Sequence, residues 1–198
     1  SVSLNAQEAA KALAGYEDRL SIAAVNDLTS VVIAGETAAL ERLVQQLQAR
    51  LIRCRYLRVN YAFHSPQMAP FQSELRSALS WLRPQSAKIA MYSTTRGVKI
   101  DGAELGADYW ASGIREAVQF AQAVEAARKD RHRIFLEVGP HPVLIGNLEQ
   151  CLAEGGADGA AIPTLRRGQD DLRCLFTALG ARYVRGGVLD FQRIPCQG

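Results

Sequence analysis

The residues best placed to do chemistry stand in the string Tyr61-Ala62-Phe63-His64-Ser65-Pro66. An alternating stretch with apolar residues ends at His64, and a helical pattern begins near Phe71. α/β proteins place their chemistry at such junctions between a strand end and a helix start. Because an unperturbed histidine has a pKa of about 6.5, His64 is a candidate general base at neutral pH. The alternative is a histidine that only closes a loop.

A second string, Phe135-Leu136-Glu137-Val138-Gly139-Pro140-His141-Pro142-Val143-Leu144, joins an apolar strand pattern to a helical pattern. A glycine between a strand and a helix favours a geometry in which backbone N–H groups at the helix start point into a cleft. A histidine after Gly-Pro at a helix start is more often a structural cap than a second base. We therefore assign no chemistry to His141.

The residues before these strings predict a small lobe with the order β-α-β-β-α-β, which is that of a ferredoxin-like unit. Asn5 and Glu8 have capping-box spacing for its first helix, which Gly15 ends. The β-branched run before Gly35 pairs with an earlier strand to predict a hairpin. In chain order, the expected elements span residues 2–4, 6–13, 20–25, 30–34, 40–50 and 52–59.

From His64 onward, helical and strand patterns alternate, which predicts an α/β core over residues 61–185. Tyr109 and Trp110 are expected to pin a loop onto this core. Asp170 or Asp171 caps a last helix, which has one apolar face, and Gly186-Gly187 ends that helix. We expect helices at 71–83, 116–129, from about 142 and after 171, strands at 89–93, 133–138 and 160–165, a loop at 101–113, and a linker tail at 186–198.

Composition excludes several classes of function. With 48% hydrophobic and 22% charged residues, the 198-residue chain has the make-up of an ordinary soluble globular protein. The net charge of +3 is too small and scattered to argue for nucleic acid. No apolar run reaches the roughly 18 residues of a membrane span. The start, Ser1 to Asn5, lacks the features of a signal peptide, so we expect no membrane and a cytoplasmic location.

The cysteines and histidines give no sign of a metal centre. Cys54, Cys151, Cys174 and Cys196 are widely spaced and form no Cys-x-x-Cys pair. Neither a zinc site nor a disulfide framework is indicated, so we expect reduced thiols and no metal.

Three strings together resemble the acyltransferase domains of modular type I polyketide synthases. Tyr61 to His64 is similar to the histidine motif of that family, and Glu137 to Pro142 is similar to its Glu-Val-Gly-Pro-His-Pro signature. Tyr109 to Phe120 resembles a string that usually reads Trp-x-x-Asn-Leu-Arg-x-Pro-Val-x-Phe, with Gly113 in place of the Asn and Ala117 in place of the Pro. The resemblance covers nearly the whole chain, but only the C-terminal part of such a domain.

The resemblance implies a fold and an activity. The fold is α/β: a ferredoxin-like small subdomain, residues 1–60, is followed by the C-terminal part of an α/β-hydrolase-like acyltransferase core, residues 61–185. The activity is the loading of a malonyl-type extender unit from coenzyme A onto the phosphopantetheine arm of an acyl carrier protein, through a Ser-His ping-pong mechanism. The implied partners are this carrier protein, malonyl-CoA or methylmalonyl-CoA, and a neighbouring ketosynthase domain with its linkers. No bound cofactor is implied.

The resemblance also implies roles for individual residues. His64 matches the catalytic base, and the backbone carbonyl of Gly113 matches the group that orients this histidine. Tyr61, Ala62 and Phe63 match positions that contribute to the choice of extender unit. In the family, Ala-Phe-His accompanies malonyl units and Ala-Ser-His accompanies methylmalonyl units, whereas a tyrosine at the first position is more typical of the latter. Since a phenyl ring beside the base fills the space of an α-methyl group, we expect malonyl.

The family's nucleophilic serine is not found in this sequence. It stands in a Gly-His-Ser-x-Gly elbow, and the chain contains no G-x-S-x-G string. We therefore expect this serine to lie outside the chain and the isolated chain to be inactive. Two alternatives stay open. One is a non-catalytic structural or docking fragment of a multidomain synthase, and the other is a ferredoxin-like small-molecule binding module fused to an unrelated α/β half.

Overall fold

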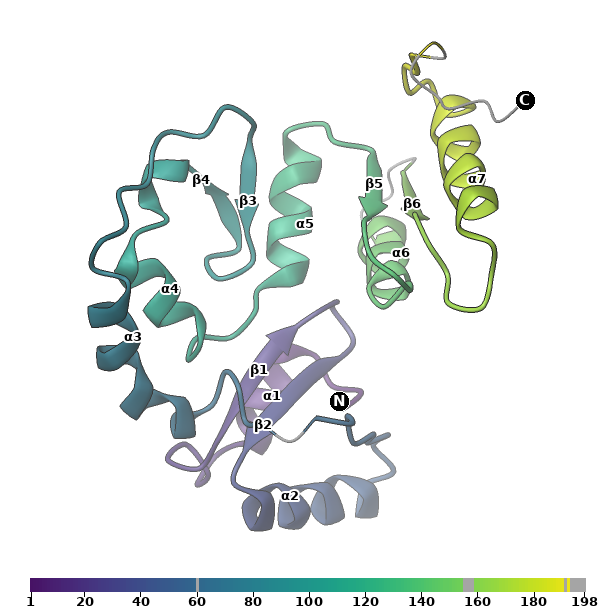
Figure 1. Ribbon diagram of the computed structural model, residues 1–198. Coiled ribbons are helices and arrows are strands. Elements are labelled where there is room, and N and C mark those ends of the chain that lie inside the picture. Colours follow the sequence, from purple (N-terminus) through teal and green to yellow (C-terminus); the bar gives the residue numbers. More distant parts are fainter. Residues whose placement is uncertain (60, 155–158, 191, 193–198) are drawn as a thin grey trace. The chain divides into compact units, whose positions relative to one another are not determined.

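In the computed structural model, residues 1–59, 61–154, 159–190 and 192 are described. The chain divides into two compact units, Ser1–Asp130 and Arg131–Gly198 (Figure 1). This division falls at Asp130, whereas the sequence led us to expect subdomain boundaries after residues 60 and 185.

The first unit begins with a hairpin and two helices. The helix α1 (Ala6–Ala12) starts with the predicted capping box, in which Asn5 Oδ1 accepts from Glu8 N at 2.9 Å and Glu8 Oε2 accepts from Asn5 N at 3.2 Å. The strands β1 (Leu20–Val25) and β2 (Val31–Gly35) pair antiparallel, and α2 (Thr37–Ala49) follows. α1 packs on β1 and α2 packs on β2 (Figure 1). The core between them is apolar: Leu20, Val31, Leu43 and Leu47 are each about 1% exposed.

The strand expected over residues 52–59 is not formed. Cys54 makes an isolated antiparallel bridge to Val2, which makes a second bridge to Val31. Beyond Cys54 the apolar side chains that favoured a strand lie in solvent, since Tyr56 is 58% exposed and Val59 is 67% exposed. The prediction was wrong because alternation alone signals a strand only where a sheet is present to cover its apolar face.

The helix expected over residues 71–83 is shorter and has a different start. Ser65 caps a 3₁₀ segment, η1 (Pro66–Phe71), which runs into α3 (Gln72–Ala78). Pro66 and Pro70 donate no backbone hydrogen bond, which suits a short 3₁₀ start better than a regular α-helical one. The expected apolar face is not buried, because Phe71 is 52% exposed and no residue of α3 is buried.

A second hairpin follows, and then a helix where a loop was expected. The strands β3 (Met91–Ser93) and β4 (Val98–Ile100) pair antiparallel, and Gly97 in the turn between them has φ +70°. The segment 101–113 forms η2 (Gly102–Glu104) and α4 (Ala107–Gly113), not a loop. A capping box between Asp101 and Glu104 starts η2, and the loop prediction overlooked this helix-start signal. The helix α5 (Phe120–Lys129) closes the unit, starting four residues later than expected.

Of the two aromatic residues expected to hold this segment on the core, only one is buried there. Tyr109 is 6% exposed, and its hydroxyl lies 2.8 Å from Oγ of the fully buried Ser93. Trp110 is 45% exposed, and its Nε1 donates to Leu105 O at 2.9 Å. Tyr109 therefore belongs to the core of the unit, whereas Trp110 lies at its surface.

Backbone pairing explains why the first sixty residues are not a separate compact unit. Val118, between α4 and α5, pairs in parallel with β1: its N–H donates to Ala23 O at 2.8 Å, and Val25 N donates to Val118 O at 2.8 Å. β1 is therefore flanked by β2 on one edge and by Val118 on the other. A strand shared in this way joins the expected small subdomain to the first part of the expected core, up to Asp130, in one unit.

The second unit contains a short parallel sheet. β5 (Ile134–Glu137) pairs with β6 (Ala160–Pro163), and α6 (Ile145–Glu154) lies between them in sequence. Asp170 caps α7 (Asp171–Tyr183) by accepting from Arg173 N at 2.8 Å. α7 buries only Ala178 and leaves the expected apolar face part-exposed: Leu172 43%, Leu175 40%, Phe176 44% and Tyr183 53%.

The last helix ends at Tyr183, three residues before the expected Gly186, which lies in the turn after it and has φ +81°. Residues 188–190 of the expected linker tail have no regular secondary structure, and residues 191 and 193–198 of that tail lie outside the described residues. No helix in the described ranges has the length and apolar character needed to cross a membrane.

Candidate functional site

The backbone of His64 is held in an unusual conformation. His64 has φ +62°, a left-handed value that costs a residue with a Cβ roughly 1–3 kcal/mol unless its surroundings impose it. Its surroundings do so from both sides. The His64 N–H donates to Ile114 O at 2.9 Å, and the His64 carbonyl accepts from Ser21 Oγ at 2.7 Å.

The ring of His64 is oriented by a third contact. Its Nδ1 lies 2.7 Å from the carbonyl oxygen of Glu116. Because a carbonyl oxygen can only accept, Nδ1 must carry the proton, and the lone pair of the neutral ring is on Nε2. The residue is half-buried. In this arrangement the ring can take up a proton at Nε2 while Nδ1 stays bound.

The orienting carbonyl is that of Glu116 and not, as expected, that of Gly113. Gly113 is the last residue of α4, so its backbone is part of a helical turn. Glu116 lies in the segment that leads to Val118 and pairs with β1, which brings its carbonyl to the ring. A Cβ at Gly113 would meet only Thr95, at 3.5 Å or more, so space does not require a glycine there.

The three residues before His64 lie together at the surface. The rings of Tyr61 and Phe63 have centroids 5.6 Å apart, and the two residues are 73% and 49% exposed. Ala62 is half-buried, and its carbonyl accepts from Ser65 Oγ at 2.6 Å. The structure therefore places the two aromatic side chains in contact with each other, directly before His64 in the chain.

Ser65 is a residue whose role the sequence reasoning missed. It is fully buried, donates to Ala62 O and accepts from Gln67 N at 3.3 Å. This serine thus turns the chain from the Tyr61–His64 stretch into η1. The signal was present, because a serine directly before a proline at a helix start is a typical N-cap.

In the second string, the side chain of Glu137 stabilises the turn that follows β5. Its carboxylate accepts from Val143 N at 2.8 Å and from Leu144 N at 3.1 Å. The N–H groups that we expected to point into a cleft are therefore bound by Glu137, and α6 begins only at Ile145. Thr164 also stabilises this turn, because its Oγ1 donates to Glu137 O at 2.9 Å and accepts from Gly139 N at 3.3 Å.

His141 has the opposite ring arrangement from His64. Its Nδ1 accepts from Arg167 N at 3.4 Å, so the proton of the neutral ring is on Nε2. This long hydrogen bond links the turn after β5 to the turn before α7. The structural assignment made from the sequence agrees with this contact.

Charged groups elsewhere in the first unit form a surface cluster. Asp130 Oδ2 accepts from Tyr92 Oη at 2.7 Å and from Lys99 Nζ at 2.9 Å. The hydrogen bond to Asp130 raises the pKa of Tyr92 and also that of Lys99. The cluster ties the β3–β4 hairpin to the end of α5.

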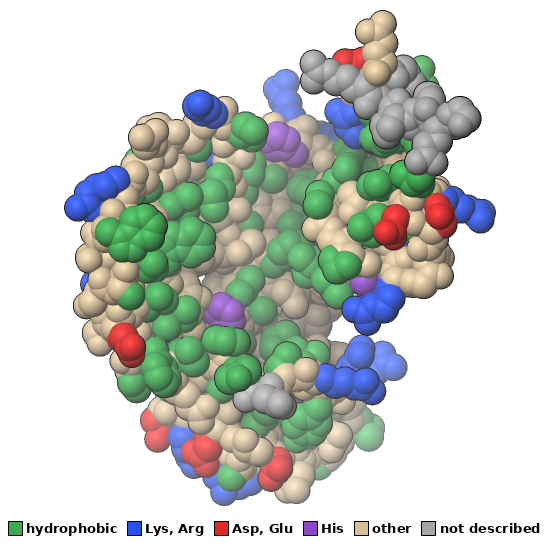
Figure 2. Space-filling view, in the orientation of Figure 1, with side chains coloured by type: hydrophobic (Ala, Val, Ile, Leu, Met, Phe, Trp, Pro, Cys, Tyr) green, Lys and Arg blue, Asp and Glu red, His purple; other side chains and the backbone are tan. Residues whose placement is uncertain are grey.

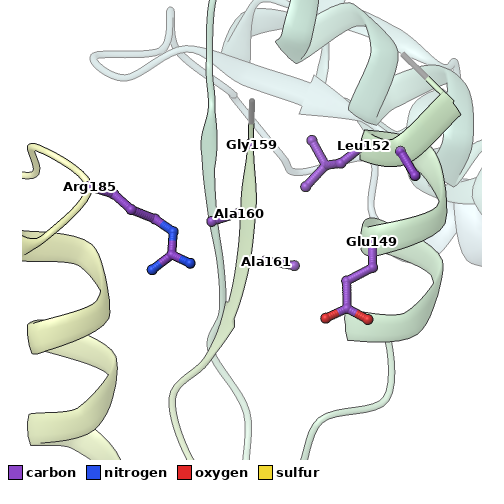
Figure 3. Close-up of a pocket in the computed structure, with 7 residues that line it drawn as sticks. Glu149, Leu152, Gly159, Ala160, Ala161 and Arg185 are labelled. Carbon is purple, nitrogen blue, oxygen red and sulfur yellow. The ribbon is translucent and has the colours of Figure 1, made fainter. Parts of the chain in front are cut away.

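An open hollow of about 390 Å³ lies in the second unit (Figure 3). Its lining comes from α6, β6 and the turn after α7, with Glu149 and Arg185 as its charged residues. It contains neither the Tyr61–His64 residues nor His141. Among the described residues, no group of three or more His, Cys, Asp or Glu side chains is arranged to hold a metal ion.

Comparison with known proteins identifies the family. The family described as the acyl transferase domain matches residues 1–188. The chain belongs to this family. One relative of this chain is Mycoketide-CoA synthase from Mycobacterium tuberculosis. The two are 35% identical over 195 residues, which cover 97% of this chain and 5% of the relative. The chain is thus part of an acyltransferase domain of the kind found in polyketide synthases.

Solved acyl transferase domains have the same fold. The acyltransferase domain from module 8 of the salinomycin polyketide synthase superposes with a TM-score of 0.92 at 30% identity, covering 96% of this chain and 45% of that domain. The acyl transferase domain of SpnD in complex with 2-(pent-4-yn-1-yl)malonyl superposes with a TM-score of 0.85 at 26% identity, covering 93% and 45%. The α/β fold expected from the resemblance is confirmed. The chain spans a little under half the length of these two domains.

Proposed function

We propose that this chain supplies the general base of an acyltransferase site, which loads a malonyl-type extender unit from coenzyme A onto the phosphopantetheine arm of an acyl carrier protein. The observation that carries the proposal is the His64 ring, whose Nδ1 is bound to Glu116 O at 2.7 Å and whose Nε2 has the lone pair. A base fixed in one tautomer is ready to take a proton from a hydroxyl nucleophile.

The proposed reaction has two halves. In the first, a serine Oγ attacks the thioester carbonyl, its proton goes to His64 Nε2, the C–S bond breaks, and the coenzyme A thiolate leaves with that proton. In the second, the carrier protein's thiol gives its proton to the same nitrogen and attacks the serine ester, and the serine recovers the proton as it leaves. Glu116 O stabilises the imidazolium in both halves, because the Nδ1–H donates to it throughout.

We place the serine outside this chain. The sequence has no G-x-S-x-G string, and the chain spans 45% of the solved domain from the salinomycin synthase. The substrates are acyl-CoA and the phosphopantetheine of the carrier protein, with no bound cofactor. A neighbouring ketosynthase domain and its linkers are the other proposed partners, and the proposed location is the cytoplasm.

We further propose malonyl as the preferred unit. Phe63 precedes the base directly and is half-exposed, and the Tyr61 ring lies against it. An aromatic surface in this place opposes an α-methyl group by steric exclusion. The SpnD domain is described in complex with 2-(pent-4-yn-1-yl)malonyl, which is substituted at C2, so that complex supports malonyl-type units in general and does not bear on the choice between malonyl and methylmalonyl.

The small subdomain remains part of the proposal. Cys54, Val2, β2 and β1 lie side by side in this order, and each neighbour is antiparallel to the next. Backbone hydrogen bonds extend the outer pair, because Ser3 N donates to Arg53 O at 3.0 Å and Arg55 N donates to Ser1 O at 2.8 Å. We interpret residues 1–60 as a reduced ferredoxin-like unit with two of its four strands shortened to bridges.

The decisive test is transfer by the intact acyltransferase domain that contains this chain. The domain is incubated with malonyl-CoA and a holo carrier protein, and the carrier is weighed by mass spectrometry. We expect the carrier to gain one malonyl group. The absence of any acyl transfer, from malonyl-CoA or from methylmalonyl-CoA, contradicts the proposal.

A docking fragment without catalysis is the second candidate, and one observation favours it. Large apolar side chains lie at the surface, among them Trp81 at 69%, Phe71 at 52% and Phe176 at 44% exposure. Figure 2 shows apolar side chains at the surface of the molecule. Such surfaces serve protein contacts. If this candidate is correct, the chain binds neighbouring synthase domains in a pull-down, while the intact domain transfers no acyl group.

A further inference from the structure

Three segments that are distant in the sequence meet at His64. They are β1, the stretch around His64 itself, and residues 114–118. The last of these is joined to β1 by the two hydrogen bonds of Val118, each 2.8 Å long. It is also joined to His64, through Ile114 O and Glu116 O. β1 is also joined directly to His64, because Ser21 on β1 donates to His64 O at 2.7 Å.

The contact of Ser21 differs in kind from the others. Ile114 and Glu116 hold His64 with backbone carbonyls, which no substitution removes, whereas Ser21 uses its side-chain hydroxyl. This hydroxyl binds the carbonyl of the residue whose φ is +62°. Fixing both the N–H and the C=O of one residue fixes its φ and ψ together. The direction of its Cα–Cβ bond, and with it the direction of the ring, is then determined.

We infer that Ser21 is a positioning residue for the His64 base: its hydroxyl keeps His64 in the left-handed conformation from which the ring reaches Glu116 O. Without the hydroxyl, one of the two bonds that impose the strained backbone is lost. His64 can then relax toward right-handed values, and its Nδ1 moves away from Glu116 O. The consequence for catalysis rests on the proposed function, but the consequence for the ring does not.

A matched pair of variants isolates the hydroxyl. Ser21→Thr keeps the hydroxyl and Ser21→Val lacks it, while both add the same β-branched shape, which β-strands accept. Ser21 is half-buried and faces Ala34 in the β1–β2 register, so the two variants meet the same neighbours. Ser21→Ala removes the hydroxyl without adding bulk and serves if the branched variants do not fold.

The first readout is the tautomer of His64, measured by ¹⁵N NMR of the ring nitrogens in the 198-residue chain at alkaline pH. In the unmodified chain and in Ser21→Thr, we expect a protonated Nδ1 and an unprotonated Nε2. In Ser21→Val and Ser21→Ala, we expect the two signals to move toward each other as the ring exchanges between tautomers. Unchanged His64 signals in either hydroxyl-free variant overturn the inference, provided that its backbone amide spectrum shows it folded.

The second readout is transfer by the intact acyltransferase domain. Ser21→Val should lower kcat by up to about 10²-fold, the effect of misplacing a catalytic group, with KM for the CoA thioester unchanged. Ser21→Thr should restore kcat. If His64→Ala does not slow transfer, the proposed function fails, whatever the ring signals show. If His64→Ala abolishes transfer while Ser21→Val changes neither kcat nor the ring signals, only the positioning inference fails.

Discussion

The turns around His64 and His141 have similar sequence settings but use their histidines in opposite ways. In the sequence, each histidine follows a strand-like pattern and precedes a helical one, although in the structure a strand, β5, precedes only His141. At His64, Nδ1 lies against a carbonyl, which leaves the lone pair on Nε2, whereas at His141, Nδ1 accepts from Arg167 N, which leaves the proton on Nε2. A single neighbouring backbone group therefore decides which ring nitrogen can act as a base.

The two turns also differ in what their other polar side chains do. Around Glu137, a carboxylate and the Thr164 hydroxyl bind N–H groups and a carbonyl of the same turn, so the polar groups are used to build it. Around His64, Ser21 and Ser65 bind backbone carbonyls and leave the imidazole Nε2 outside the network. The turn around His64 thus presents an atom, whereas the turn around His141 uses its polar groups to hold its own shape.

The largest effect that tests this contrast is the loss of the His64 ring. In the intact domain, we expect His64→Ala to lower kcat for malonyl transfer by roughly 10²- to 10⁴-fold, the usual worth of a positioned general acid–base group. His141→Ala and His132→Ala, which keep the base, should cost much less. A greater loss in His141→Ala, with the fold intact by circular dichroism, means that the two roles have been exchanged.

The next effect is on stability in the second unit. Glu137→Ala leaves two backbone N–H groups without their charged acceptor, for which we expect a loss of about 2 kcal/mol in the opening free energy of β5 and β6. Native-state hydrogen exchange of the amides of these strands measures it. Glu149→Ala, on the exposed side of α6, is the matched control and should change little. The contrast between the turns is refuted if Glu137→Ala alters the His64 ring signals while β5 and β6 remain as stable as before.

A smaller effect concerns selectivity beside the base. Phe63→Ser should raise the use of methylmalonyl relative to malonyl by about tenfold, near the lower limit for one methyl group, because Phe63 is only half-buried. Competition between the two CoA thioesters in the intact domain gives the ratio. Val143→Ser, an exposed substitution in the other turn, should leave it unchanged. An unmodified domain that already prefers methylmalonyl-CoA shows that Phe63 does not set the choice.

The last prediction is that the chain alone gains no acyl group. The 198-residue chain incubated alone with malonyl-CoA should keep its mass, because it offers a base without a serine elbow. Intact-mass spectrometry, followed by hydroxylamine treatment, checks this. A stoichiometric, hydroxylamine-sensitive adduct would reveal a nucleophile within residues 1–198 and would place the complete reaction in this chain.

Local signals in the sequence determined much of the secondary structure. The capping box of Asn5 and Glu8, the hairpin before Gly35 and the cap at Asp170 were all found where the residues predicted them. Each depends on groups a few residues apart, so a short stretch of sequence contains the whole interaction. The three strings also identified the family correctly, because each is a continuous stretch of residue types.

Tertiary structure alone decided how His64 is held. Glu116 O, 52 residues from His64, replaced the expected carbonyl of Gly113, and Ser21, 43 residues away, gave no signal in the sequence. Whether residues 52–59 formed a strand was likewise decided by the presence or absence of a sheet beside them. The physical reason is the same in each case: a hydrogen bond or a buried face needs a partner, and the fold determines which distant segment supplies it.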